Sequence, residues 1–132
     1  YNVIYAKQDP PRQIINDEVE KVSDMINVPI VLDYHHYKCN KCDIDIKKIF
    51  NTWNIKPKLH FSSPKSKKNF RSHSDYINSD DFIEFIEFIK KYNTDVDIML
   101  ETKMKDEALF RLVRELKYKT NYNFIDDTSF EI

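Results

Sequence analysis

The sequence predicts an α/β fold of four consecutive strand–helix units around a parallel sheet. Short apolar runs rich in β-branched residues alternate with stretches of helical periodicity, and strict alternation of this kind favours right-handed crossovers between parallel strands. The chain has 132 residues, 41% of them hydrophobic, so it can form one domain with a core. Four units in this length match half of an eight-unit TIM, or (βα)8, barrel.

The expected elements follow in order from the N-terminus. The second strand is almost continuous in apolar residues, as buried parallel strands are. Each helix has apolar residues three or four positions apart, and Ser79 is a candidate N-cap. A chain without glycine must place Asn or Asp at left-handed positions. We expect strands at 2–5, 28–33, 57–62 and 96–101, helices at 12–27, 43–54, 79–89 and 106–117, and a tail without a clear element.

The two faces of the later strands differ in chemistry. In the third strand His60 lies on the face opposite Leu59 and Phe61, and in the fourth Glu101 lies opposite Leu100. Polar residues on an inward face near the carboxyl end of a strand are typical of a barrel's active site. Four strands cannot close an eight-stranded barrel. The chain is therefore a fragment, one half of a two-chain assembly, or a small open sheet.

Polar clusters follow the strands at the points where they end. Asp33 and His36 are separated by two residues just after the second strand, where a turn lets both reach one centre. His60 and Glu101 end neighbouring strands, and His73 follows a basic loop. Carboxylates and imidazoles are ligands of divalent metals. Singly, each has another interpretation, since a histidine is often a surface or core residue, Asp33 a turn former and Glu101 a helix-start carboxylate.

Lys58 shares the face of His60. A lysine pointing into a barrel is unfavourable unless it is paired, neutral or modified. A neutral amine can take up carbon dioxide and become a carbamate ligand of a metal. The alternative is a structural ion pair with Asp33 or Glu101.

The overall charge and the cysteines add little. A net charge of −1 gives no global signal for nucleic acid, although the basic run from 56 to 71 suits a phosphate-rich partner or a solvated loop. Cys39 and Cys42 form an isolated CxxC, which we interpret as an incidental reduced pair. There is no signal peptide, lipidation motif or apolar run of transmembrane length, and a cytoplasmic protein is expected.

Four segments together resemble the UV damage endonuclease (UvsE/UVDE) family. They are VPIVLDYHH (28–36), KPKLHFSSP (56–64), RSHSDYI (71–77) and DIMLETKMKDEALFRL (97–112), in the family's order. The resemblance implies the C-terminal half of a TIM barrel related in architecture to endonuclease IV. It also implies a metal cluster, with Mn²⁺ expected, that serves to cut the DNA backbone 5′ to UV photoproducts.

Site residues are carried over from this resemblance position by position. The chain departs from the family pattern at three points. Two upstream histidines of the family have no counterpart here, and the place of a bridging glutamate reads YAKQDPP (5–11), without a glutamate. Tyr37 stands in place of a third successive histidine. From residue type and placement we further infer contacts to backbone phosphates. The implied metal ligands are Asp33, His36, His60, His73 and Glu101, with Lys58 as the lysine that can be carboxylated; Lys58, His60 and Glu101 are the implied catalytic residues, and Arg71, Ser72, Tyr76, Ser62, Ser63 and Lys103 are the candidate DNA contacts.

The sequence thus predicts a DNA repair endonuclease, or a fragment of one, that is weak or inactive alone. We divide it into a divergent first strand and helix (1–27), a half-barrel (28–117) and an acidic tail (118–132). The expected partners are damaged duplex DNA and either a second copy, through open sheet edges, or a missing N-terminal half-barrel. The alternatives are a non-catalytic metal- or DNA-binding remnant and another metal-dependent barrel such as a sugar isomerase.

Overall fold

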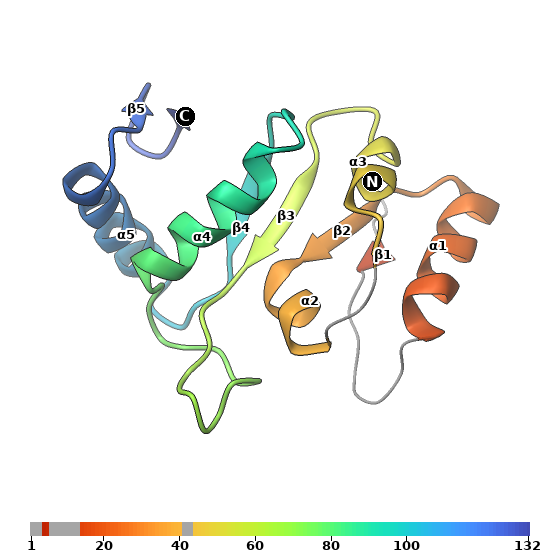
Figure 1. Cartoon of the computed structure of the whole chain (residues 1–132), viewed down its shortest axis with the longest axis horizontal. Coiled ribbons are helices and arrows are strands. Elements are labelled where there is room, and N and C mark those ends of the chain that lie inside the picture. The colour runs from red at the N-terminus through yellow and green to blue at the C-terminus, as the bar shows by residue number, and fades with distance from the viewer. Residues whose placement is uncertain (1–3, 6–13, 41–43) are drawn as a thin grey trace.

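The computed structural model of the chain describes residues 4–5, 14–40 and 44–132. Short strands alternate with helices along most of the described chain (Figure 1). No helix among these residues is long and apolar enough to cross a membrane. The elements are β1 (Ile4–Tyr5), α1 (Ile14–Ile26), β2 (Ile30–Asp33), α2 (Tyr34–Asn40), α3 (Ile46–Asn51), β3 (Lys58–Phe61), α4 (Ser79–Lys90), β4 (Asp97–Leu100), α5 (Lys105–Lys119), β5 (Asn123–Phe124) and β6 (Phe130–Glu131).

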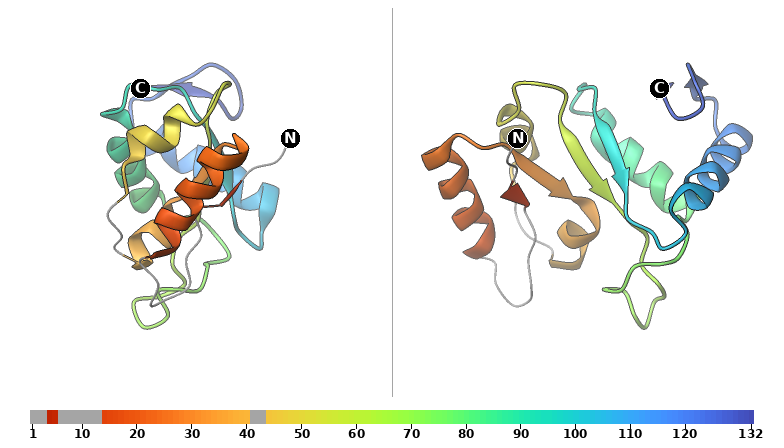
Figure 2. Two further views of the ribbon diagram at one scale, coloured as in Figure 1. Left: turned by 90° about the vertical axis from the view of Figure 1, so that its right-hand side faces the viewer. Right: turned by 180° about the vertical axis from the view of Figure 1, so that it is seen from behind.

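The first four strands form one parallel sheet in the order β1-β2-β3-β4. Strands that follow one another in the sequence are neighbours in the sheet, which is the commoner arrangement in strand–helix–strand folds. Seen from behind, β3 and β4 lie in front of α4, so no described helix covers this face of the two strands in that view (Figure 2). The predicted parallel α/β fold is confirmed, whereas the prediction that the sheet is half of a TIM barrel stays a prediction.

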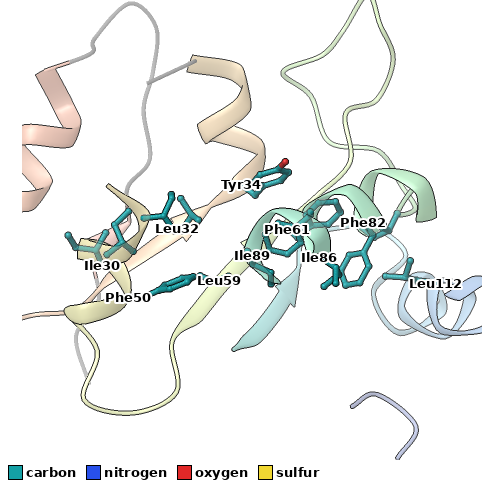
Figure 3. Close-up of a cluster of buried hydrophobic side chains, with 14 of the residues drawn as sticks. Ile30, Leu32, Tyr34, Phe50, Leu59, Phe61, Phe82, Ile86, Ile89 and Leu112 are labelled. Carbon is teal, nitrogen blue, oxygen red and sulfur yellow. The ribbon is translucent and has the colours of Figure 1, made fainter. Parts of the chain in front are cut away.

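The hydrophobic core lies between the sheet and the helices on its other face (Figure 3). Leu59 and Phe61 of β3 are 0% and 2% exposed, and the Phe61 ring stacks on Phe85 of α4 with centroids 4.9 Å apart. Tyr34, at the start of α2, packs against Phe85 at 4.7 Å. Burying aromatic rings in such numbers is the main force that holds α4 on the sheet.

Local structure differs from the sequence expectation at four places. The residues after Asp33, where a turn was expected, form the short helix α2. The helix expected at 43–54 is the shorter α3, capped by Asp45. The N-cap of α4 is Asn78 rather than Ser79, because the Asn78 side chain accepts hydrogen bonds from the amides of Asp80 and Asp81. The tail is not without structure, since β5 and β6 form an antiparallel hairpin.

Left-handed backbone positions largely follow the expectation for a chain without glycine. Asn27 has φ of 54° and directly follows the end of α1. Asn93 has φ of 47° and lies shortly after the end of α4. Lys105 at the start of α5 has φ of 42°, which the prediction of Asn or Asp did not cover.

Candidate metal centre

The pairing of the parallel strands brings together side chains that are far apart in the sequence. Asp33 at the end of β2 lies opposite His60 of β3. The amide of Glu101, just past β4, donates to the carbonyl of Phe61 at 2.9 Å, so the ladder between β3 and β4 continues to this point. Because the carboxyl ends of parallel strands meet at one edge of the sheet, three residues from three strand ends become neighbours.

These three residues form a compact set of possible metal ligands. One ligand atom each from Asp33, His60 and Glu101 lies within 4.8 Å of the others. His60 Nδ1 is 2.6 Å from Glu101 Oε1, a hydrogen bond in which the ring N–H donates to the carboxylate. In that tautomer Nε2 carries the lone pair that a metal would use.

His36 extends the set through Asp33. The carboxylate of Asp33 lies directly before α2 and accepts the His36 amide at 3.0 Å, which is the geometry of a helix cap. Its other oxygen is 2.6 Å from His36 Nδ1. Burial raises the pKa of the Asp33 carboxyl, but the His36 side chain and amide lower it by more, so that the pKa falls below its usual value. Asp33 is therefore a buried carboxylate held in its charged form.

His73 reaches the set from the loop after β3. Its Nδ1 is 3.6 Å from Glu101 Oε2, and its ring centroid is 6.0 Å from that of His36. The structure thus brings all five predicted ligands, Asp33, His36, His60, His73 and Glu101, into one continuous cluster, while their role as ligands stays a prediction.

Lys58 lies apart from this cluster. Its ammonium group pairs with Asp97 of β4, the residue opposite it in the ladder, and Lys56 Nζ is 3.6 Å from the same carboxylate. Lys58 forms an ion pair, as the alternative interpretation predicts, but the predicted partner is wrong, because Lys58 pairs with Asp97 rather than with Asp33 or Glu101. Modification of Lys58 stays a prediction, and in the structure its nitrogen serves as a hydrogen-bond donor to Asp97.

Two of the predicted DNA contacts are buried. Ser63 is 2% exposed, and its hydroxyl accepts the amide of Asn78, which fixes the start of α4. Ser62 is also buried, and its Oγ has no hydrogen-bond partner among the described residues. Burial argues against phosphate contacts by these serines, since a phosphate is reached from the solvent-exposed surface.

The other predicted DNA contacts are at least partly exposed. Arg71 and Lys103 are exposed, and the Ser72 hydroxyl donates to Asn69 at 2.9 Å. Tyr76 lies over α5, where its hydroxyl donates to Glu107 at 3.0 Å and its ring lies 4.6 Å from the Arg111 guanidinium. Tyr76 is therefore held against a helix rather than pointing freely into solvent.

His35 is a buried residue of this region that sequence reasoning did not assign. It is 3% exposed, its Nε2 is 3.2 Å from the carbonyl of Arg71, and its ring contacts His73 edge-on at 5.0 Å. Burial lowers the pKa of the His35 ring, which favours its neutral form. The pair His35–His36 was visible in the sequence, but only the α2 helix decides that His36 faces Asp33 and His35 faces the loop. Cys39 is half-buried with a free thiol, and Cys42 lies outside the described residues.

The donor set fits a divalent metal. Two ligands on opposite sides of such an ion are about 4 Å apart, given metal–ligand bonds of roughly 2.0–2.2 Å, so shifts of less than about an ångström would close a triad that already lies within 4.8 Å. Imidazole combined with carboxylate suits Mn²⁺, Fe²⁺ or Zn²⁺. The segment expected to hold an upstream glutamate, 5–11, lies outside the described residues except for Tyr5.

Comparison with known proteins gives a consistent family match. The UV-endonuclease UvdE family matches residues 11–131. A UV DNA damage endonuclease of Bacillus cereus (strain G9842) is 47% identical over 97 residues, and one of Bacillus anthracis (strain A0248) is 45% identical over 96. These alignments cover 68% and 67% of this chain but 31% and 30% of the relatives, so the chain spans about a third of their length.

A solved structure shares the fold. The crystal structure of SacUVDE superposes with a TM-score of 0.70 at 22% sequence identity, covering 88% of this chain and 39% of the other. At this identity the likeness concerns the fold alone.

Proposed function

The chain belongs to the UV-endonuclease UvdE family, and on that premise we propose that it is a DNA repair endonuclease, or a part of one, that cuts the phosphodiester backbone 5′ to UV photoproducts. The observation that supports this most directly is the cluster of Asp33, His60 and Glu101 at the carboxyl ends of three strands. The family match favours this function over the sugar isomerase alternative, which rests on fold analogy only.

The proposed metal ligands divide into two groups. Asp33, His60 and Glu101 would hold a divalent ion, with Mn²⁺ as the proposed metal. When bound, such an ion activates water for attack on a phosphodiester and offsets the charge that develops on the phosphate. His36 and His73, each beside one carboxylate of the triad, would either complete the ligand set or orient those carboxylates.

The chain's own residues supply positioning and electrostatics. His60 donates to Glu101, which fixes the orientation and the tautomer of the ring. The charged Asp33 is buried with His36 beside it, so that the centre is preorganised before a substrate arrives. Exposed Arg71 and Lys103 are the proposed contacts to the phosphates next to the cut, and this binding would weaken as salt concentration rises.

Incision by the chain alone is proposed to be weak or absent. The chain spans about a third of the length of its curated relatives, and β4 forms an edge of its sheet. An open edge would be covered by a second copy or by a further half-barrel. In the second candidate function the chain binds metal and DNA without catalysis, and the same small span favours it.

The test is incision of a duplex that contains a single pyrimidine dimer, with Mn²⁺, by the chain and by His60→Ala. Phe110→Ala is the matched control, because Phe110 is exposed on α5 and takes part in none of the contacts described above for the cluster. We expect any cut 5′ to the dimer to be lost in His60→Ala and kept in Phe110→Ala. Equal incision by all three proteins would contradict the proposed centre. Mn²⁺ and DNA binding without a cut would select the non-catalytic function.

A further inference from the structure

The loop at 64–73 is strongly basic and reaches beyond the carboxyl ends of the strands (Figure 1). Its sequence, PKSKKNFRSH, contains three lysines and an arginine and no acidic residue. Lys65, Lys67 and Lys68 are exposed, and none of them has an ion-pair partner among the residues that the structure describes. Such a concentration of unneutralised positive charge attracts polyanions.

Hydrogen bonds hold this loop in a defined shape. Its two arms pair at the base, where the Lys65 amide donates to the Ser72 carbonyl at 2.7 Å and Pro64 bridges to His73. Near the tip, the Asn69 side chain accepts the Ser72 hydroxyl at 2.9 Å, and the Asn69 amide donates to the Ser66 hydroxyl at 2.9 Å. Hydrogen bonds therefore fix the loop both at its base and near its tip, as in an irregular hairpin.

Phe70 stands near the tip of the loop with part of its ring in solvent. It is 38% exposed, and it stacks on the buried His35 ring at 5.7 Å with an interplanar angle of 19°. His35 Nε2 also lies 3.2 Å from the Arg71 carbonyl, so one buried side chain supports both the aromatic ring and the backbone beside it. A partly exposed phenyl ring with its orientation fixed from beneath is a surface on which a flat group can stack.

The loop also adjoins the candidate metal centre. His73 ends the loop and lies 3.6 Å from Glu101, while His35, beneath Phe70, contacts His73. A polyanion held by the lysines would thus lie next to the centre. Lys21, Lys47 and Lys90 are also exposed but belong to α1, α3 and α4, outside this loop.

We propose that loop 64–73 is a DNA-binding element, in which Lys65, Lys67 and Lys68 contact backbone phosphates and Phe70 stacks on a base that has left the helical stack. This inference rests on the proposed function, because it names the part of the damaged duplex that the centre meets. Lysines beside an aromatic side chain are the combination that binds unstacked nucleotides without sequence preference. Unpaired or damaged bases leave the stack at the lowest free-energy cost, so Phe70 would discriminate such sites from intact duplex.

The experiment measures binding without metal, so that incision plays no part. The probes are a labelled duplex with one unpaired base and the matched intact duplex, each titrated with the chain over a range of salt. We compare Phe70→Leu, Phe70→Trp and the control Phe110→Leu. Phe70→Leu should weaken binding to the duplex with the unpaired base by about tenfold, leaving intact duplex within about twofold. Phe70→Trp, which keeps a ring, and Phe110→Leu should bind like the parent chain.

The lysines are tested by the salt dependence of binding. Replacing all three loop lysines with alanine should weaken binding to both duplexes and reduce the slope of log K against log salt by about 2–3. The control is the triple alanine variant of Lys21, Lys47 and Lys90, which should keep the slope. Equal loss from both triple variants, or a Phe70→Leu effect that is the same on both duplexes or absent from both, would overturn the proposal.

The outcome is separable from that of the proposed function. If the loop binds DNA as described but the chain never cuts DNA, the DNA-binding role of the loop is supported and the proposed nuclease function is contradicted. If Phe70→Leu still cuts DNA and binds the duplex with the unpaired base as the parent chain does, the proposed role of the loop is contradicted and the nuclease function is supported. Where Phe70→Leu loses the circular dichroism spectrum of the parent chain, Phe70→Met takes its place with the same expected loss. Where the triple lysine variant loses that spectrum, the three single lysine substitutions take its place.

Discussion

The two faces of β3 are buried to similar degrees but for different physical reasons. Leu59 and Phe61 pack beneath α4 and are 0% and 2% exposed. His60, between them in sequence, is 7% exposed on the opposite face, where it meets Glu101. Removing apolar side chains from water stabilises the fold, whereas burying an imidazole and a carboxylate is unfavourable unless they bond to each other.

This contrast indicates how the chain can maintain a polar cluster. The aromatic core on the α4 side fixes the position of β3. The pairing of β3 with β2 and β4 then places His60 beside the carboxyl ends of these two strands. The cluster itself adds little to stability, since buried ion pairs roughly balance desolvation against attraction. We therefore expect stability and metal binding to separate when residues on the two faces are changed one at a time.

The largest effect is expected from Phe61→Ala on the apolar face. Loss of the ring that stacks on Phe85 and Tyr34 should lower the free energy of unfolding by about 3–5 kcal/mol, a large part of the stability of a domain of this size. Urea unfolding followed by circular dichroism measures it. A loss as large from His60→Ala, measured in the same way, would contradict the division between the two faces.

The next effect concerns metal binding on the polar face. Glu101→Gln should reduce the affinity for Mn²⁺ by at least about tenfold, because a carboxylate of the triad is lost while the shape is kept. Asp97→Asn is the matched control, since it likewise replaces a carboxylate with an amide, but at the start of β4, where it affects the pairing with Lys58 and Lys56. Calorimetric titration with Mn²⁺ decides the matter, and equal losses in both variants would argue against a centre at Glu101.

The smallest effect is a dependence of stability on alkaline pH. Burial against the aromatic core raises the pKa of Tyr34 to about 12, with the nearby Glu84 acting in the same direction. Because the phenolate is the disfavoured form in the folded chain, this contribution is complete below pH 10, the ordinary pKa, and is lost as pH rises through 12. Between pH 10 and 12 the melting temperature of Tyr34→Phe should therefore fall less with rising pH than that of the parent chain. An equal fall in both proteins would show that Tyr34 makes no such contribution.

Much of the fold could be predicted from short-range patterns. Apolar alternation in β3 and β4 correctly separated Leu59 and Phe61 from His60, and helical spacing located α1, α4 and α5 to within a few residues. Caps and short elements were less predictable, because Asn78 and Ser79 are both good N-cap residues and only the local backbone selects Asn78. The hairpin of β5 and β6 depends on the stacking of Phe130 with Tyr122 at 4.9 Å, a contact with no periodic signal.

The sequence by itself determined the α/β order, the candidate ligands and their placement at strand ends, since these follow from periodicities of a few residues and from the chemistry of side chains. Only the tertiary structure decided which of those side chains meet. The register of β2, β3 and β4 places Asp33 beside His60 and Lys58 beside Asp97, and the turn into α2 directs His36 to Asp33 and His35 to the loop. Pairing between strands is set by packing across many residues, and one-residue shifts would reverse every face.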